Sequence, residues 1–243
     1  MAPESPPADQ PSAEKAVAPV AAAEQARGVS AEGAVRLGSY EILPHMRLKH
    51  LDQGPVLAYA ARPIGHAGTP TYFALLGENW LMPRIKTAEI MAGMTNPCFI
   101  RVSAQGVVYW PAAKSERYAF VYENNLGQPL MLSVQGQGLG WKSEKALLTM
   151  IKPMASVLAD LRDRDLVHGR INPTNMFDGN ARTLERIILG DCAATPAGFI
   201  QPALFEPIER AQCDPLGRGI GTAEDDMYAL GVSLTVLLRT RDP

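Results

Sequence analysis

The spacing of apolar residues changes once along this chain, near residue 124. Before that point, short apolar runs are separated by Gly and Pro, a pattern typical of strands and turns. The runs are SYEIL (39–43), PVLAYAARP (55–63), TYFALL (71–76), FIRVS (99–103), VVYWP (107–111) and YAFVYE (118–123). After it, apolar residues recur with helical spacing. The change predicts an α+β chain, with an antiparallel sheet in the first half and helices in the second.

Two helices are marked clearly. The first covers 83–94 inside the strand-rich half, where Pro83 is an entry signal and Asn96-Pro97 a stop. The second covers 143–166 and is predicted to place one apolar stripe on the core: Leu147, Leu148, Ile151, Met154, Leu158 and Leu161. Pro153 lies inside this helix and should kink it or mark a late start.

The first 36 residues consist mainly of Ala, Pro, Glu, Ser and Gln, with almost no large apolar side chains. Such a segment cannot repay the entropy of ordering, so we predict a disordered tail. The chain therefore divides into a tail (1–36), a sheet-rich part (37–123) and a helical part (124–243).

The composition limits the partners. With 243 residues, 47% of them hydrophobic, the chain can bury a core, and its net charge of −2 gives no basic field for nucleic acid or an anionic membrane. The longest apolar segment, 227–238, is shorter than the roughly 20 residues of a spanning helix. Three cysteines without paired spacing predict a reducing, cytoplasmic setting rather than disulfides or zinc.

Four short motifs follow one another in the helical half. The first is His168-Gly169-Arg170-Ile171-Asn172-Pro173-Thr174-Asn175, which comes directly after the long helix. An apolar strand then leads into Asp191-Cys192-Ala193, and FEPIERA (205–211) and EDDMYALGV (224–232) come next.

In this order and spacing, the chain from Tyr40 onward resembles the eukaryotic-like protein kinases in their bacterial form. The family's loop reads His-Arg-Asp-Leu-Lys-Pro-x-Asn, often with Gly in second place, and here His168, Pro173 and Asn175 match it. Asp191 stands where the family has the acid of Asp-Phe-Gly. The resemblance also assigns Glu209 to the acid of Ala-Pro-Glu and Asp226 to the first residue of a central helix. It implies a two-lobed fold, with a sheet-rich small lobe (37–123) and a helical large lobe (124–243).

Phosphoryl transfer needs a glycine-rich loop, a strand lysine paired with a helix glutamate, metal ligands and an acid that orients the substrate hydroxyl. In the loop region only Gly54 is present. The lysine position corresponds to Leu76 and the glutamate position to Thr87. Arg170 replaces the orienting acid, and Asn172 replaces a phosphate-binding lysine.

Two oxygen ligands survive, Asn175 and Asp191, the pair that holds magnesium in active relatives. They are candidates for binding a metal and ATP. The alternative is structural: Asn175 bonds its own loop and Asp191 pairs with Arg170. Tyr122 corresponds either to a bulky residue at the back of the nucleotide pocket or to an ordinary core tyrosine. Cys192-Ala193 replaces Phe-Gly, so we expect this segment to be static.

These losses favour a catalytically inactive pseudokinase that acts as a scaffold or allosteric regulator. Two alternatives stay open. One is a transferase that recruits Lys49 or Lys86 and uses Asn175 and Asp191 for metal. The other is a domain that binds nucleotide only as a structural ligand.

In the family, further helices follow the one that ends this chain, so the resemblance suggests an incomplete large lobe. We favour this interpretation. The alternative is that the flank formed by Leu230, Leu234, Leu237 and Leu238 is exposed and must be covered by a protein partner or a second copy along 226–240. Other contacts are expected inside the domain. Glu209 should pair with Arg210 or Arg218, Asp226 should cap its helix and bind the backbone near His168, and His168 should pack beneath the loop.

Overall fold

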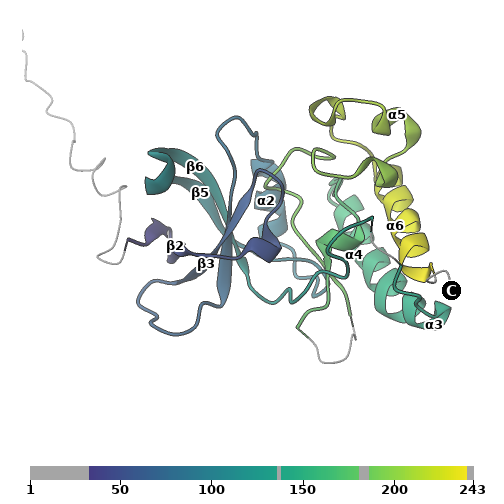
Figure 1. Ribbon diagram of the computed structural model, residues 1–243, viewed down its shortest axis with the longest axis horizontal. Coiled ribbons are helices and arrows are strands. Elements are labelled where there is room, and N and C mark those ends of the chain that lie inside the picture. Colours follow the sequence, from purple (N-terminus) through teal and green to yellow (C-terminus); the bar gives the residue numbers. More distant parts are fainter. Residues whose placement is uncertain (1–32, 136–137, 181–185, 240–243) are drawn as a thin grey trace, which may run out of the picture.

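The computed structural model describes residues 33–135, 138–180 and 186–239 and shows two lobes side by side (Figure 1). Most of the predicted tail lies outside these ranges. The boundary at residue 36 is wrong, because the first strand, β1 (Val35–Leu37), already includes Val35 and Arg36. Ala34 and Val35 are buried, so they belong to the core of the small lobe.

The small lobe is a six-stranded antiparallel sheet in the order β1-β2-β3-β4-β6-β5. Its strands after β1 are β2 (Tyr40–Arg47), β3 (Leu57–Pro63), β4 (Tyr72–Leu76), β5 (Val102–Trp110) and β6 (Ser115–Glu123). The predicted sheet is confirmed, except that the runs FIRVS and VVYWP contribute to a single strand, β5.

The two faces of the sheet bury different clusters, because side chains alternate along each strand. One face packs on helix α2 (Ile85–Ala92), which buries Thr87, Ala88 and Met91, and continues into the core of the large lobe. The other face forms a separate cluster: Val35, Leu37, Ile42, Tyr59, Ala61, Ala74, Leu76, Val108, Trp110, Ala119 and Val121. This cluster is enclosed because the sheet curls until β1 packs against β5.

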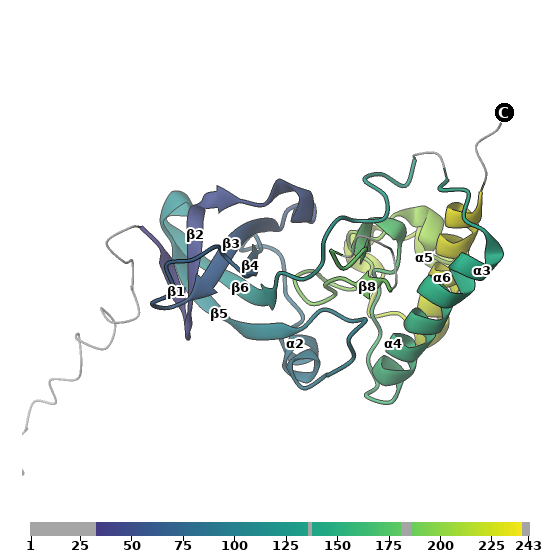
Figure 2. The same cartoon turned by 90° about the horizontal axis from the view of Figure 1, so that it is seen from below.

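The large lobe holds its helices at the end of the molecule far from the small-lobe sheet (Figure 2). They are α3 (Ser143–Ala146), α4 (Lys152–Arg162), α5 (Ile208–Ala211) and α6 (Ala223–Leu238). A two-stranded ladder, β7 (Met176–Phe177) and β8 (Ile188–Leu189), lies between them and the small lobe. Short 3-10 turns cover 49–51, 111–113, 173–175, 203–205 and 215–217.

The predicted long helix is present, but part of it is π-helical instead of α-helical. A π-helical segment, Leu147–Ile151, joins α3 to α4. The second residue of α4 is Pro153, which has no N–H to continue the regular ladder. The predicted stripe was wrong at its start, where Leu147 and Leu148 are more than half exposed, and Ile151 and Leu158 are only partly buried. The buried stripe is Ala146, Met150, Met154, Val157 and Leu161.

Helix α6 begins at a capping box between Thr222 and Asp225. The alternative of an exposed apolar flank is contradicted for two of its four leucines. Leu230 and Leu237 are buried against the rest of the lobe, and only Leu234 and Leu238 remain partly exposed. The large exposed apolar side chains of α6 are instead Met227 and Tyr228. Within the described ranges, no helix is long and apolar enough to cross a bilayer.

The burial of α6 gives a direct test. Leu237 is fully buried, so Leu237→Ala should lower the free energy of unfolding by about 2–5 kcal/mol through lost packing and a residual cavity. Leu132→Ala is the matched control, since this leucine is 85% exposed and its truncation should change stability by less than about 0.5 kcal/mol. Urea denaturation measures both. Equal effects would contradict the packing of α6.

Candidate functional site

His168 lies beneath the loop that follows α4 and is fully buried, as predicted. Its Nδ1 accepts a hydrogen bond of 3.1 Å from the backbone N–H of Arg170. The ring proton must therefore sit on Nε2, which donates to the carbonyl of Gly190 at 3.2 Å. Burial lowers the pKa of His168 to about 3, against the opposing effect of the bond to Gly190. The imidazole is thus neutral and structural.

Asp226 holds the same loop from the large-lobe side. Its two carboxylate oxygens accept from the backbone N–H groups of His168 at 2.6 Å and Gly169 at 2.8 Å, which confirms the predicted contact. Its predicted capping role was wrong, because Thr222 and Asp225 cap the helix. Burial raises the pKa of Asp226 to about 6, and the two N–H donors only partly offset this.

The position directly after His168 requires glycine. Gly169 has a φ of +70°, and a Cβ added to it would lie 2.9 Å from the Cβ of Ala197. Its carbonyl accepts from Gly198 N–H at 2.9 Å, so the loop and the segment after Asp191 pack backbone to backbone.

Arg84 is a site residue that sequence reasoning missed. It precedes α2 in the small lobe, yet its guanidinium donates to three carbonyl oxygens of the large lobe. The distances are 2.6 Å to Val167, 2.9 Å to His168 and 2.9 Å to Cys192. No sequence motif indicates these contacts, because the acceptors are backbone atoms more than 80 positions away.

Asp191 is buried and surrounded by donors from the protein itself. The Tyr122 hydroxyl donates to Oδ1, and the backbone N–H groups of Ala193 and Ala194 donate at 2.8 and 3.0 Å. Burial, followed by the charge of Asp191, raises the pKa of Tyr122 well above its usual value, so the phenol remains a donor. Tyr122 therefore belongs both to the sheet core and to the cleft.

Asn175 and Asn172 bind the loop itself. The amide of Asn175 donates to the carbonyls of Arg170 at 3.0 Å and Asp191 at 3.1 Å, while its Oδ1 is buried without a hydrogen-bond donor. Asn172 accepts from Thr174 N–H at 2.9 Å and donates to Gln201 at 2.8 Å. Both asparagines are fully buried.

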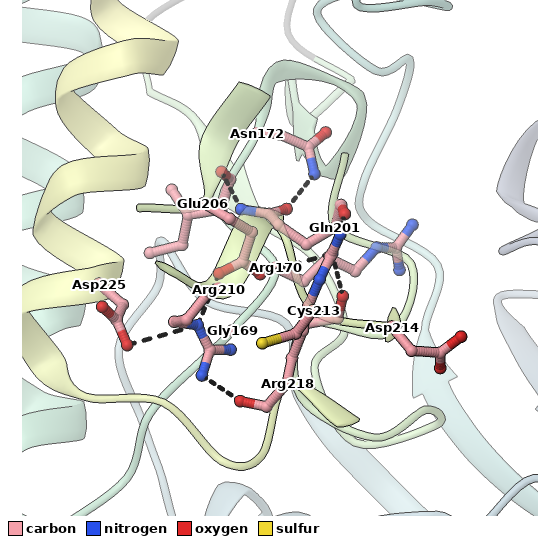
Figure 3. A network of polar contacts seen from close by, with 12 residues as sticks. Gly169, Arg170, Asn172, Gln201, Glu206, Arg210, Cys213, Asp214, Arg218 and Asp225 are labelled. Carbon is pink, nitrogen blue, oxygen red and sulfur yellow. Dashed lines mark hydrogen bonds and ion pairs between the residues drawn. The ribbon is translucent and has the colours of Figure 1, made fainter. Parts of the chain in front are cut away.

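Arg170 points its side chain away from the polar network around Glu206 and Arg210 (Figure 3). Its Nη1 is buried without a hydrogen-bond acceptor. Burial lowers the pKa of Arg170 to about 10, and the charge of Asp191 opposes this shift. No ion pair within 4.0 Å joins Arg170 to Asp191 among the described residues, so the predicted pair is only a longer-range attraction.

The strand position assigned to a lysine was wrong by one residue. Leu76 faces the enclosed cluster behind the sheet, away from α2, whereas Leu75 is fully buried on the side of α2. The alternation of strand side chains makes Leu75, and not Leu76, the residue that faces α2. The helix position is consistent with Thr87, which is buried, and one turn later Met91 contacts Cys192 with a sulfur-to-sulfur distance of 3.6 Å.

The single-glycine loop between β2 and β3 reaches the large lobe. A Cβ on Gly54 would lie 3.3 Å from the side chain of Ile200, so the turn sits directly on the segment after Asp191. Nearby, the rings of Trp80 and Phe199 meet edge to face at 5.8 Å. The two lysines considered for recruitment, Lys49 and Lys86, are both exposed.

The buried acid of the FEPIERA segment is Glu206, not Glu209 (Figure 3). Glu206 accepts from Arg210 at 2.7 Å and lies 3.8 Å from Arg218. Glu209 is exposed, because the one-turn helix α5 directs it to solvent. Arg210 and Arg218 were predicted as partners of Glu209, but they pair with Glu206 instead. Arg218 also donates to the carbonyls of Gly198 and Gln201 at 2.8 and 2.6 Å.

As arranged, Asn175 and Asp191 fit hydrogen bonding better than metal ligation. A divalent cation prefers several oxygen ligands with free lone pairs. Asp191 already accepts from Tyr122 and two backbone amides, and only Oδ1 of Asn175 is unused. Across the described ranges, no three His, Cys, Asp or Glu side chains gather into a metal-binding group.

The two lobes, the buried histidine loop and the Asp191 segment between them define a protein kinase-like fold. No protein-family model matches the chain, and no curated protein matches its sequence. Solved structures do match. Two structures of the Mycobacterium tuberculosis PknI kinase domain, 14% and 16% identical, superpose with TM-scores of 0.59 and 0.58. Each covers 84% of this chain, which spans 74% and 75% of those chains. A structure of Rad53 1–466 in complex with AMP-PNP, 14% identical, gives 0.59 over 82% of this chain and 48% of that one.

Stability should depend on pH through His168. The native pKa of about 3 lies below the ordinary 6.5, so between these values the unfolded chain binds a proton that the native ring does not. The advantage of the wild type over His168→Gln in free energy of unfolding should be complete above pH 6.5 and shrink toward pH 3. Urea denaturation at several pH values measures it.

Asp226→Asn is the control of opposite sign. The native pKa of about 6 lies above the ordinary 3.8, so the native state takes up the proton first. The free energy of unfolding of the wild type should therefore rise relative to that of Asp226→Asn as the pH falls from 6 to 3.8. If the difference in free energy of unfolding between the wild type and His168→Gln did not vary with pH, the imidazole of His168 would not be buried in its neutral form.

Glu206 and Glu209 form a matched pair for mutation. Glu206→Ala leaves Arg218 buried without its acid and should cost about 3–5 kcal/mol of unfolding free energy. Glu209→Ala changes an exposed side chain and should cost less than about 0.5 kcal/mol. Thermal and urea denaturation compare them, and a larger loss for Glu209→Ala would restore the original assignment.

Proposed function

We propose that this chain is a catalytically inactive protein kinase-like domain, a pseudokinase, that acts by binding another protein as a scaffold or allosteric regulator. The observation that carries the proposal is the state of Asp191. Its carboxylate is buried and engaged by Tyr122 and by two backbone amides of its own segment. Phosphoryl transfer would need these oxygens for a metal ion.

The residue in the place of the orienting acid supports the same conclusion. Arg170 carries only donors and remains protonated, since its lowered pKa is still about 10. It cannot accept a proton from a substrate hydroxyl. Leu75, on the α2 side of β4, offers no cation to a phosphate, and Thr87 on α2 offers no carboxylate.

One observation favours a second candidate, a domain that still binds nucleotide or transfers a phosphoryl or nucleotidyl group. Oδ1 of Asn175 is buried without a donor, and a cation would satisfy it. Such a cation, with ATP, would have to compete with the Tyr122 hydroxyl for Asp191. The same binding experiment separates the two candidates.

A melting curve with ATP and either magnesium or manganese tests the proposal. A ligand that binds only the native state raises the melting temperature. We expect no rise for the wild type in either metal, because Asp191 is already engaged.

A metal-dependent rise that is lost in Asp191→Ala and kept in Asp163→Ala would instead support the second candidate. Asp163 is an exposed acid at the end of α4, so its variant controls for the loss of a negative charge. Each variant is compared with itself without ligand, which removes differences in intrinsic stability.

The setting and partner remain part of the proposal. All three cysteines are free, which suits a reducing cytoplasm. The exposed Met227 on α6 borders an apolar pocket of about 310 Å³ between α4 and the start of α6, and the exposed Tyr228 follows it along the helix. A protein partner, or a second copy of the chain, would find its apolar contact there.

A further inference from the structure

Arg84 connects the small lobe to two separate segments of the large lobe. Its guanidinium reaches the carbonyls of Val167 and His168 in the loop and that of Cys192 after Asp191. Its backbone N–H also donates to the carbonyl of Ala193 at 2.8 Å. One residue at the start of α2 therefore makes four hydrogen bonds across the lobe boundary.

The chemistry of arginine fits this arrangement. A guanidinium has five N–H donors in a rigid plane, so a single side chain can satisfy acceptors from two segments. The positive charge also lies near Asp226, where it opposes the rise in that residue's pKa. Arg84 is partly buried, which strengthens bonds to its charged group.

Tyr122 makes a second polar link across the boundary. It belongs to β6 in the small lobe, and its hydroxyl donates to Asp191 of the large lobe. The ring is fully buried and stacks on Phe73 with centroids 5.3 Å apart, so the hydroxyl cannot turn to water without disturbing the sheet.

The backbone adds a third link. Ile100 N–H donates to the carbonyl of Leu189 at 3.0 Å, and Leu189 N–H donates to that of Cys98 at 2.9 Å. The segment between α2 and β5 thus pairs with β8. The apolar core also runs without a break from the sheet into the large lobe.

We infer that Arg84 and Tyr122 form an interlobe lock that holds the cleft in one arrangement, so that both lobes unfold as a single cooperative unit. The lock rests on contacts within the chain and stands whether or not nucleotide binds. It implies that a regulator of this domain acts on a fixed surface, or must first displace Arg84 from its three carbonyls.

Hydrogen exchange during a urea titration of the full chain tests the lock, with peptides from α2 reporting the small lobe and peptides from α6 the large lobe. In the wild type both should lose protection at the same urea concentration. In Arg84→Ala, α2 should open at lower urea than α6 and exchange at least about tenfold faster without urea, since bonds to a charged group are lost. Tyr122→Phe should likewise make α2 lose protection at a lower urea concentration than α6.

Two further variants keep the test decisive. Arg84→Lys retains the charge but cannot span the three carbonyls, so it should separate the urea midpoints of α2 and α6 by less than Arg84→Ala does. If Arg84→Ala does not fold, Arg84→Lys replaces it. Arg101→Ala removes an exposed small-lobe arginine and should leave the two midpoints coincident. Separate midpoints in the wild type, or coincident ones in both Arg84→Lys and Tyr122→Phe, would overturn the inference.

Discussion

The peptide groups of Val167, His168 and Gly169 are held from two opposite sides, and the rest of the molecule is arranged around them. Asp226, on the central helix of the large lobe, takes up two of their N–H groups. Arg84, at the start of the only helix packed on the small-lobe sheet in the described chain, takes up two of their carbonyls. Buried backbone polar groups need partners, and here the partners come from different lobes. The loop is therefore the point at which the lobes are fixed to each other.

The same need for partners governs the cleft. Asp191 and Asn175 are the oxygen ligands that we predicted for a metal, and in this chain their polar atoms are directed largely at other protein groups. Tyr122 supplies a donor from the sheet, and Arg170 supplies positive charge nearby. Most donors and acceptors described in this enclosed site are matched within the protein, and the exceptions are Nη1 of Arg170 and Oδ1 of Asn175. Such a site has little left to offer a substrate, which links the stability of the cleft to the proposed lack of catalysis.

Much of the fold was readable from the sequence, while the errors have a common physical form. The order of strands and helices followed from periodicity and from Gly and Pro signals, and His168, Asn175, Asp191 and Asp226 were found by their motif. The mistakes were local shifts along the chain. Leu76 was chosen instead of Leu75 because alternation in a strand gives two faces, and a sequence does not state which one meets the helix. Glu206 and Glu209 lie nearly one turn apart, and only packing decides which is buried.

The sequence by itself determined the class of fold and placed His168 in the loop after the long helix, because both depend on residue identity and local spacing. The tertiary structure alone decided what the residues of the site do. The bonds of Arg84 end on backbone carbonyls, which have no signature in the sequence, and the bond from Tyr122 to Asp191 joins residues 69 positions apart. Long-range contacts of this kind are set by how two lobes meet, and that geometry exists only once the whole core has formed.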